Sequence, residues 1–149
     1  MISNACIPLL LATLMLGATA GAREQRIVCP AEIPMSSIRL IDTPEPWKAH
    51  VAASIPLSSA GATAGPPERK AVLMGDSTWK KGATAWTTTY DLAGAGFPEG
   101  KWMECRYGEY DQISYSVRLD ERTSSCKVEI VQGIKAGQKN ITILCQRIP

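Results

Sequence analysis

Apolar and polar residues alternate through four segments in the last third of the chain, and this alternation predicts β-strands. In residues 113–119, for example, Ile, Tyr, Val and Leu occupy every second position. A period of two is expected of a strand that buries one face and exposes the other to water. Short polar turns separate the four predicted strands, which span residues 101–107, 113–119, 126–131 and 140–145. We therefore expect a mainly β protein, built as an antiparallel meander, a sandwich or a small barrel.

Shorter patterns earlier in the chain predict further strands on either side of a proline-rich break. Pro44 and Pro46 exclude a helix interior at that break. After it, residues 48–53 are expected to form a single helical turn or a loop that packs Trp47 inward, so that the mature chain has at most one short helix. Gly75 and Asp76 are expected to form a turn. The strands predicted in this part are residues 26–29, 37–41, 71–74 and 84–90.

One long segment lacks the bulky residues that strands and helices usually bury. Residues 54–67 are mostly Ser, Ala, Gly and Pro, and they carry no charge. Such side chains offer little surface for burial, and Gly and Pro favour turns. We therefore expect a flexible loop over about residues 54–70.

The first 22 residues have the layout of a secretory signal peptide. An apolar run over residues 7–16 is followed by small residues up to Ala22, and charge begins at Arg23. This order predicts export, with cleavage after Ala22 or Ala20, to the periplasm or the exterior. The alternative is a buried N-terminal helix. Residues 23–149 would then form a single β-rich domain.

Four cysteines would remain after cleavage, and an even number in an exported chain predicts two disulfides. They are Cys29, Cys105, Cys126 and Cys145. Three pairings are open: Cys126 with Cys145 would leave Cys29 for Cys105, and Cys105 with Cys126 is a comparable alternative. No two cysteines have the Cys-x-x-Cys spacing of a zinc knuckle, so no metal is expected.

The charge of the chain excludes some classes of partner. The formal net charge is +2, and Lys80-Lys81 is the densest basic spot. Nucleic-acid-binding proteins usually cluster many more Lys and Arg residues, so we expect no nucleic-acid partner. No second apolar stretch is long enough to predict insertion into a membrane after signal cleavage.

No set of residues indicates a catalytic site, and we expect neither an enzyme nor a cofactor. The single histidine, His50, has no carboxylate nearby at helical spacing. Gly75-Asp76-Ser77 is a weak match to a serine-hydrolase signature, and no histidine follows Ser77. The carboxylates of the C-terminal part alternate with Lys and Arg, as on solvated strand faces. They are Glu99, Glu104, Glu109, Asp111, Asp120 and Glu121.

Aromatic residues near predicted turns are the best candidates for contacting a partner. Trp and Tyr combine apolar bulk with a polar tip, which suits interfaces. Trp86 and Trp102 lie within predicted strands and are expected in the core. The expected binding residues lie near Lys80-Lys81-Gly82 and in the Tyr107–Tyr110 turn, and they are Trp79, Lys80, Lys81, Tyr107 and Tyr110.

Several of these segments together resemble a family of small exported proteobacterial proteins of unknown function, some of which are encoded near type VI secretion genes. The resemblance covers most of the mature chain loosely and the Trp-x-x-Cys-x-Tyr segment at residues 102–107 more closely. It implies an envelope location and a disulfide-containing β-rich domain. The segments that carry it are Cys29-Pro30, Trp86, residues 101–107, Val117-Arg118-Leu119 and Cys126-Lys127-Val128.

A fainter likeness is to the periplasmic inhibitors of C-type lysozyme. A cysteine strand that ends in Gly108 and an alternating strand around Tyr115 are similar to segments of those small β-barrels, which insert a polar loop into the enzyme cleft. Their Ser-Gly-x-x-Tyr loop has no recognisable counterpart in this chain.

The leading hypothesis from the sequence is a periplasmic binding protein, in particular an inhibitor or immunity protein against a cell-wall-directed enzyme. It follows from predicted export, two predicted disulfides, exposed aromatic residues and the absence of a catalytic constellation. The alternatives are an envelope hydrolase that uses carboxylates or Ser77, and a purely structural envelope protein.

Overall fold

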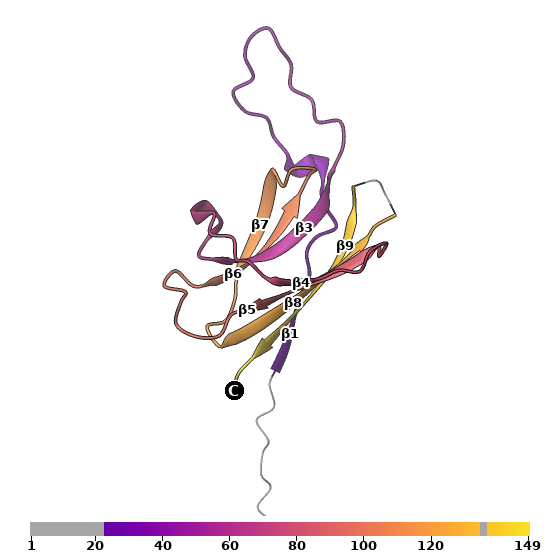
Figure 1. Ribbon diagram of the computed structural model, residues 1–149. Helices are drawn as coiled ribbons and strands as arrows, with labels where there is room; N and C mark the ends of the chain where they lie inside the picture. Colours follow the sequence, from indigo (N-terminus) through magenta and orange to yellow (C-terminus); the bar gives the residue numbers. More distant parts are fainter. Residues whose placement is uncertain (1–22, 135–136) are drawn as a thin grey trace, which may run out of the picture.

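The computed structural model describes residues 23–134 and 137–149, which form two antiparallel β-sheets (Figure 1). One sheet has five strands in the order β1-β9-β8-β5-β4, and the other has four in the order β2-β3-β6-β7. The predicted mainly β class is therefore confirmed. The signal peptide expected in residues 1–22 lies outside the described residues.

The described part of the chain contains nine strands and two three-residue 3-10 helices. The helices are η1 (Met35–Ser37) and η2 (Pro67–Arg69). The strands are β1 (Arg23–Ile27), β2 (Glu32–Ile33), β3 (Ile55–Ala64), β4 (Asp76–Thr78), β5 (Ala85–Asp91), β6 (Lys101–Tyr107), β7 (Ile113–Arg118), β8 (Thr123–Gln132) and β9 (Lys139–Arg147).

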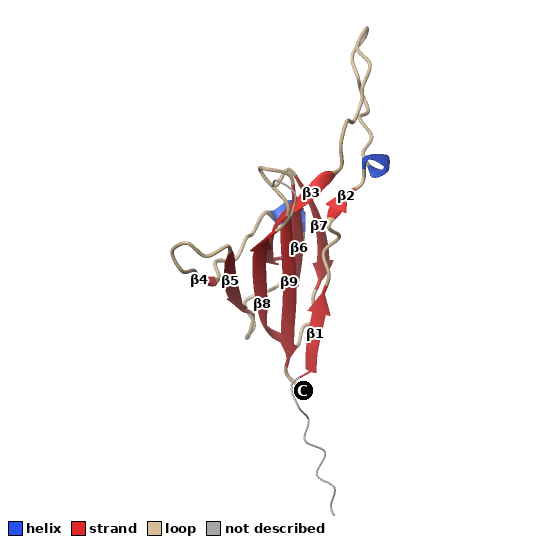
Figure 2. Ribbon diagram, turned by 90° about the vertical axis from the view of Figure 1, so that its right-hand side faces the viewer, coloured by secondary structure: helices blue, strands red, loops and turns tan. Residues whose placement is uncertain are grey.

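The four alternating segments all form strands, as predicted, but they do not form one continuous meander. β6 pairs with β7 in the four-stranded sheet, whereas β8 pairs with β9 in the five-stranded sheet. The chain therefore passes from one sheet to the other between β7 and β8 (Figures 1 and 2). Alternation identifies a strand with one buried face, but it does not identify the sheet to which that strand belongs.

Strand β3 replaces the flexible loop that we expected over residues 54–70. It is a central strand that pairs with β2 and β6, and its side chains are among the most buried, with Ala62 fully inaccessible. Its small residues are needed for close packing. A Cβ atom at Gly61 would lie 2.8 Å from the hydroxyl oxygen of Tyr90, on β5 of the other sheet. The small side chains of β3 therefore do not indicate mobility; they allow neighbouring elements to approach closely.

Four shorter predictions for residues 37–76 are also wrong. Residues 37–41 form the end of η1 and an extended segment without a neighbouring strand, and residues 48–53 are not helical. Trp47 is 75% exposed rather than packed inward. The expected turn at Gly75-Asp76 runs directly into β4. The predicted strand at residues 71–74 forms only an isolated bridge between Val72 and Thr63.

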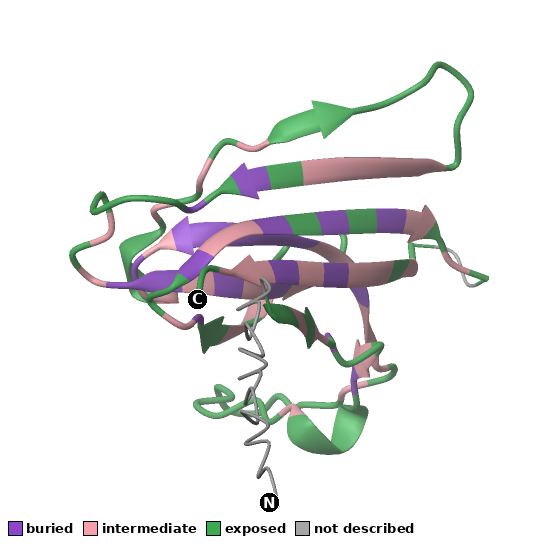
Figure 3. Ribbon diagram, turned by 90° about the horizontal axis from the view of Figure 1, so that it is seen from below, coloured by how far each residue is buried: buried purple, intermediate pink, exposed green. Residues whose placement is uncertain are grey.

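The core lies between the sheets, and burial alternates along the strands that line it (Figure 3). In β8, for example, Cys126, Val128 and Ile130 are buried, and the residues between them are exposed. Trp86, which was expected in the core, is partly buried against it. Trp102 is also only partly buried.

Two disulfides join the core strands in one of the pairings that the sequence left open. Cys126 and Cys145 are direct cross-strand partners on β8 and β9. Cys29, which follows β1, is bonded to Cys105 on β6 and so connects the segment between the two sheets to the four-stranded sheet.

Candidate functional site

The turn between β4 and β5 presents the first group of predicted binding residues. Trp79, Lys80 and Lys81 are all exposed there. Gly82 has a φ of 81°, a conformation that glycine adopts without steric cost. The backbone N–H of Ala83 donates to the carbonyl oxygen of Lys80 at 2.9 Å, which closes the turn. The turn thus holds an indole ring and two ammonium groups at the edge of the five-stranded sheet.

This turn borders a shallow surface hollow of about 480 Å³. The Nζ atom of Lys139, the first residue of β9, lies 5.3 Å from the centroid of the Trp86 ring on β5, within range of a cation–π contact. Aromatic faces beside ammonium groups suit contact with a protein side chain. The residues that line the hollow are Ser77, Thr78, Trp79, Lys80, Ala83, Ala85, Trp86 and Thr87.

The second predicted group is divided between the core and the surface. Tyr107 was expected to be exposed, but its side chain is fully buried at the end of β6. Its hydroxyl donates to the carbonyl oxygen of Pro30 at 3.1 Å, and its ring packs edge-on against Tyr115. Burial raises the pKa of Tyr107 to about 12. Tyr107 therefore cannot contact a partner from the surface.

Tyr110, by contrast, is exposed on the turn between β6 and β7. The hydroxyls of Ser58 and Ser59 anchor this turn by donating to Oδ1 of Asp111 at 2.7 and 3.0 Å. The turn belongs to the four-stranded sheet, whereas Trp79 lies at the edge of the five-stranded sheet. The structure thus places the two predicted aromatic contacts on different sheets rather than in one site.

A polar hollow that the sequence analysis did not identify lies over β6, next to the Tyr110 turn. There Nε of Arg106 donates to Oε2 of Glu104 at 2.8 Å, and both side chains are largely buried. The Nη2 atom of Arg106 is buried and has no hydrogen-bond partner among the described residues. The sequence shows only that Glu104 and Arg106 alternate with apolar residues. The burial of these two side chains depends on the neighbouring strands β3 and β7. The lining residues are Pro67, Lys70, Val72, Glu104, Arg106, Asp111, Gln112 and Ser114.

The groups considered for serine-hydrolase chemistry are not assembled into a site. Ser77 is exposed on β4, and its hydroxyl lies 2.9 Å from the hydroxyl of Thr88. His50 is exposed on a different segment, between η1 and β3. A Ser nucleophile needs a base within hydrogen-bond reach. Thr88 does not supply one.

Four of the six C-terminal carboxylates pair with arginines, and only the Glu104 pair is largely buried. The Arg69 guanidinium holds the pKa of Glu99 below its usual value through hydrogen bonding. The pKa of Asp120 is lowered first by the backbone N–H and then by the guanidinium of Arg122. Such pairing favours the ionised carboxylate, whereas a general acid needs a raised pKa.

Two other kinds of site have no candidate in the described part of the chain. Residues 23–134 and 137–149 contain no group of three or more His, Cys, Asp or Glu side chains placed to hold a metal ion. Within the same residues, no helix has the length and apolar character needed to cross a membrane.

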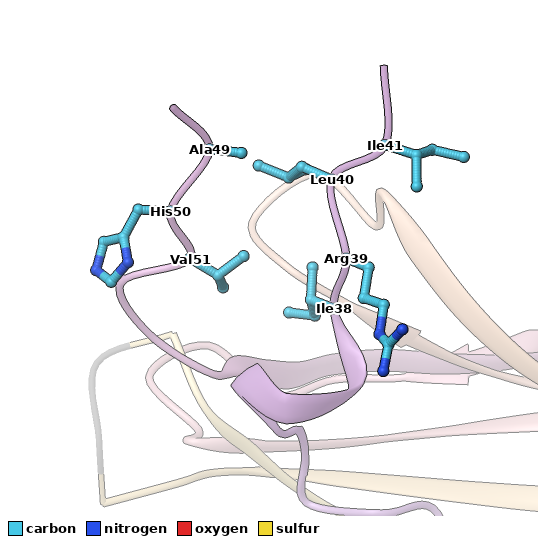
Figure 4. A pocket seen from close by; sticks show the side chains of 7 residues that line it. All are labelled: Ile38, Arg39, Leu40, Ile41, Ala49, His50 and Val51. Carbon is cyan, nitrogen blue, oxygen red and sulfur yellow. The ribbon is translucent and has the colours of Figure 1, made fainter. Parts of the chain in front are cut away.

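The most prominent feature that the sequence analysis missed is an arm formed by residues 38–54. It projects beyond the sheets between η1 and β3 (Figures 1 and 2). Its two limbs run side by side with Leu40 directed toward Ala49 and Ile38 toward Val51, whereas His50 and Ile41 point outward (Figure 4). A hollow of about 410 Å³ lies along these limbs.

Comparison with known proteins gives one match. The model of the type VI secretion system Tli immunity protein family matches residues 52–146, which extend from the end of the arm through β3 into β9. No curated protein and no solved structure matches the chain, so the likeness to lysozyme inhibitors has no support from these comparisons. The family match covers well over half of the sequence, and it agrees with the resemblance to proteins encoded near type VI secretion genes. This chain belongs to the type VI secretion system Tli immunity protein family.

Proposed function

We propose that this protein acts in the periplasm, where it binds a type VI secretion effector and blocks its activity. The observation that carries the proposal is the family match over residues 52–146, which includes most of both sheets. An immunity protein needs a binding surface and no catalytic site. The separation of Ser77 from His50 and the ion-paired carboxylates fit this requirement.

The periplasmic part of the proposal rests on the disulfides and on the predicted signal peptide. Both bonds connect buried cysteines of the core. Disulfides persist in oxidising compartments such as the periplasm and are rare in the cytosol. An effector that damages the cell envelope would be met in that compartment.

A protection assay tests both parts of the proposal. Each type VI effector of the source bacterium is sent to the periplasm of a susceptible host, with or without residues 1–149 of this protein. We expect survival to be restored against one effector, and a chain of residues 23–149 alone to give no protection. If the full chain lowers the toxicity of none of the effectors, the proposed function is wrong. If residues 23–149 protect equally well, the periplasmic location is wrong.

We also propose that Trp79 and Tyr110, one on each sheet, both contact the effector, and measuring the affinity for the effector that is neutralised in the protection assay tests this. The Trp79→Ala/Tyr110→Ala variant should bind the neutralised effector on the order of 10- to 100-fold more weakly, as expected when interface aromatics are removed. Met74→Ala is a matched control, because Met74 is 97% exposed and lies outside both turns. The two single variants separate the contributions of the two sheets. Unchanged affinity of the double variant would remove both aromatic contacts from the proposal.

A further inference from the structure

The arm formed by residues 38–54 exposes bulky apolar side chains to water. Ile41 is 81% exposed and Trp47 is 75% exposed, and Leu40, which precedes Ile41 in the chain, is exposed as well. The two strands at its base, β2 and β3, pair through Ile33 and Ile55. The arm is therefore a long projection from paired strands. Contiguous exposed apolar side chains on a folded protein usually mark an interaction site.

The backbone of the arm is extended but unpaired. The whole segment is described, and no backbone hydrogen bond joins its two limbs; the bond from Trp47 N–H to the Pro44 carbonyl oxygen, at 2.9 Å, lies within the tip. Pro44 and Pro46 restrict the backbone of that tip. The backbone N–H and C=O groups of the limbs are thus available to a partner. Because the prolines already reduce the conformational freedom of the tip, ordering it on binding costs less entropy.

The charges of the arm also lack partners. Asp42 and Glu45 lie at the tip between Ile41 and Trp47, and Arg39 and Lys48 flank them on the two limbs. None of these four side chains forms an ion pair in the structure, although all are described. Elsewhere on the surface, Glu99 and Asp120 are neutralised by arginines. The arm therefore presents large apolar side chains together with acidic and basic side chains that have no ion-pair partner.

We propose that the arm inserts into a cleft of the effector, with Ile41 and Trp47 against an apolar floor and with Asp42 and Glu45 facing basic groups of that cleft. A convex, narrow projection requires a concave partner. A lipid bilayer is disfavoured because embedding the tip would desolvate both carboxylates. A second copy of this chain is disfavoured at the Arg106 hollow, because that hollow is lined by charged residues and does not suit apolar side chains.

This inference rests on the proposed function and adds to it a second contact. The family match begins at residue 52, so the tip precedes the matched residues and is mounted on the body that they form. The arm and the turn that carries Trp79 are separate segments of the chain, so substitutions can test the two contacts independently.

The test measures binding of the effector that is neutralised in the protection assay. We expect Ile41→Ser/Trp47→Ser to weaken binding roughly 100-fold or more, as for two central anchors of an interface. Met74→Ser, which changes a more exposed apolar residue outside the arm, should stay within about threefold of the parent protein. Amide hydrogen exchange at residues 38–54 should also slow when the effector is bound. Because the changed residues are exposed, both variants should keep the unfolding midpoint of the parent protein.

The other results separate this inference from the proposed function. If the arm variant binds the effector as tightly as the parent and exchange at the arm is unchanged, the arm inference is wrong and the immunity function stands. If the variant instead abolishes self-association, or binding to phosphatidylcholine vesicles, while effector binding persists, the occupant is a second copy or a lipid surface and the inference is again wrong. If the parent protein neutralises no effector, both proposals fail.

Discussion

Tyr107 and Tyr110 are three residues apart in one segment, yet the fold gives them opposite environments. Tyr107 is the last residue of β6 and points to the same face as the buried Met103 and Cys105. Tyr110 follows Gly108, where the turn begins, and is exposed. The alternation of residues 101–107 already placed Tyr107 with Cys105, so this pattern was a better guide to burial than nearness to the turn.

The buried hydroxyl of Tyr107 predicts a loss of stability at high pH. Its pKa is about 12 in the folded protein, above the ordinary value of 10. Folding thus favours the protonated form, and that contribution is complete below pH 10 and disappears as the pH rises through 12. We expect the free energy of unfolding to fall between pH 10 and 12 as this contribution is lost. Denaturant unfolding of the parent protein and of Tyr107→Phe measures the effect.

The comparison between these two proteins isolates Tyr107, because burial also raises the pKa of Tyr90. Tyr107→Phe should be less stable at pH 8, since the Pro30 carbonyl loses its donor, but its stability should fall less steeply above pH 10. Parallel curves for the two proteins would show that Tyr107 ionises normally.

At the scale of elements, composition was misleading at β3 and at the arm, in opposite directions. Small residues in β3 predicted a loop, but they form a buried central strand; alternating apolar residues at 37–41 predicted a strand, but they form one limb of an unpaired arm. Strand preference depends mainly on packing against neighbouring strands rather than on the backbone of a single segment. β3 has β2 and β6 as neighbours, whereas the arm has none.

Hydrogen exchange distinguishes these two elements directly. We expect amides of β3 that pair with β6 to exchange at least about 1000-fold more slowly than amides in the arm, because β3 opens only when the core does. Mass spectrometry of peptic fragments from the free protein measures both segments in one experiment. The edge strand β7 serves as an internal reference of intermediate protection. If residues 55–64 exchange as fast as the arm, then this segment is a flexible loop and not a central strand.

At the scale of the whole molecule, one disulfide connects neighbouring strands of a hairpin and the other connects segments that are distant in the chain. Cys126–Cys145 closes 19 residues within the β8–β9 hairpin. Cys29–Cys105 closes 76 residues, and that loop contains β2, β3, β4 and β5 together with the arm. A cross-link restricts the unfolded chain more strongly when the loop that it closes is longer.

Removing the long-range bond should therefore cost more stability than removing the short-range one. We expect Cys29→Ala/Cys105→Ala to lower the free energy of unfolding by about 4 kcal/mol and Cys126→Ala/Cys145→Ala by about 3 kcal/mol, from loop-closure entropy alone. All four cysteines are buried, so the packing losses are comparable. Urea unfolding followed by circular dichroism gives both values. A larger loss for the hairpin pair would show that local packing, rather than chain entropy, dominates.

The sequence by itself determined the properties that depend on neighbours along the chain. Alternation identified β6 to β9, because a strand with one buried face needs a period of two wherever it lies. The even number of cysteines indicated two bonds, and the segment around Trp102 and Cys105 pointed to the right family. The tertiary structure alone decided what depends on residues distant in the chain. It selected the cysteine pairing, made β3 a strand by supplying two partners, and buried Tyr107. It also left the arm without a partner, because no strand of the described chain lies beside it.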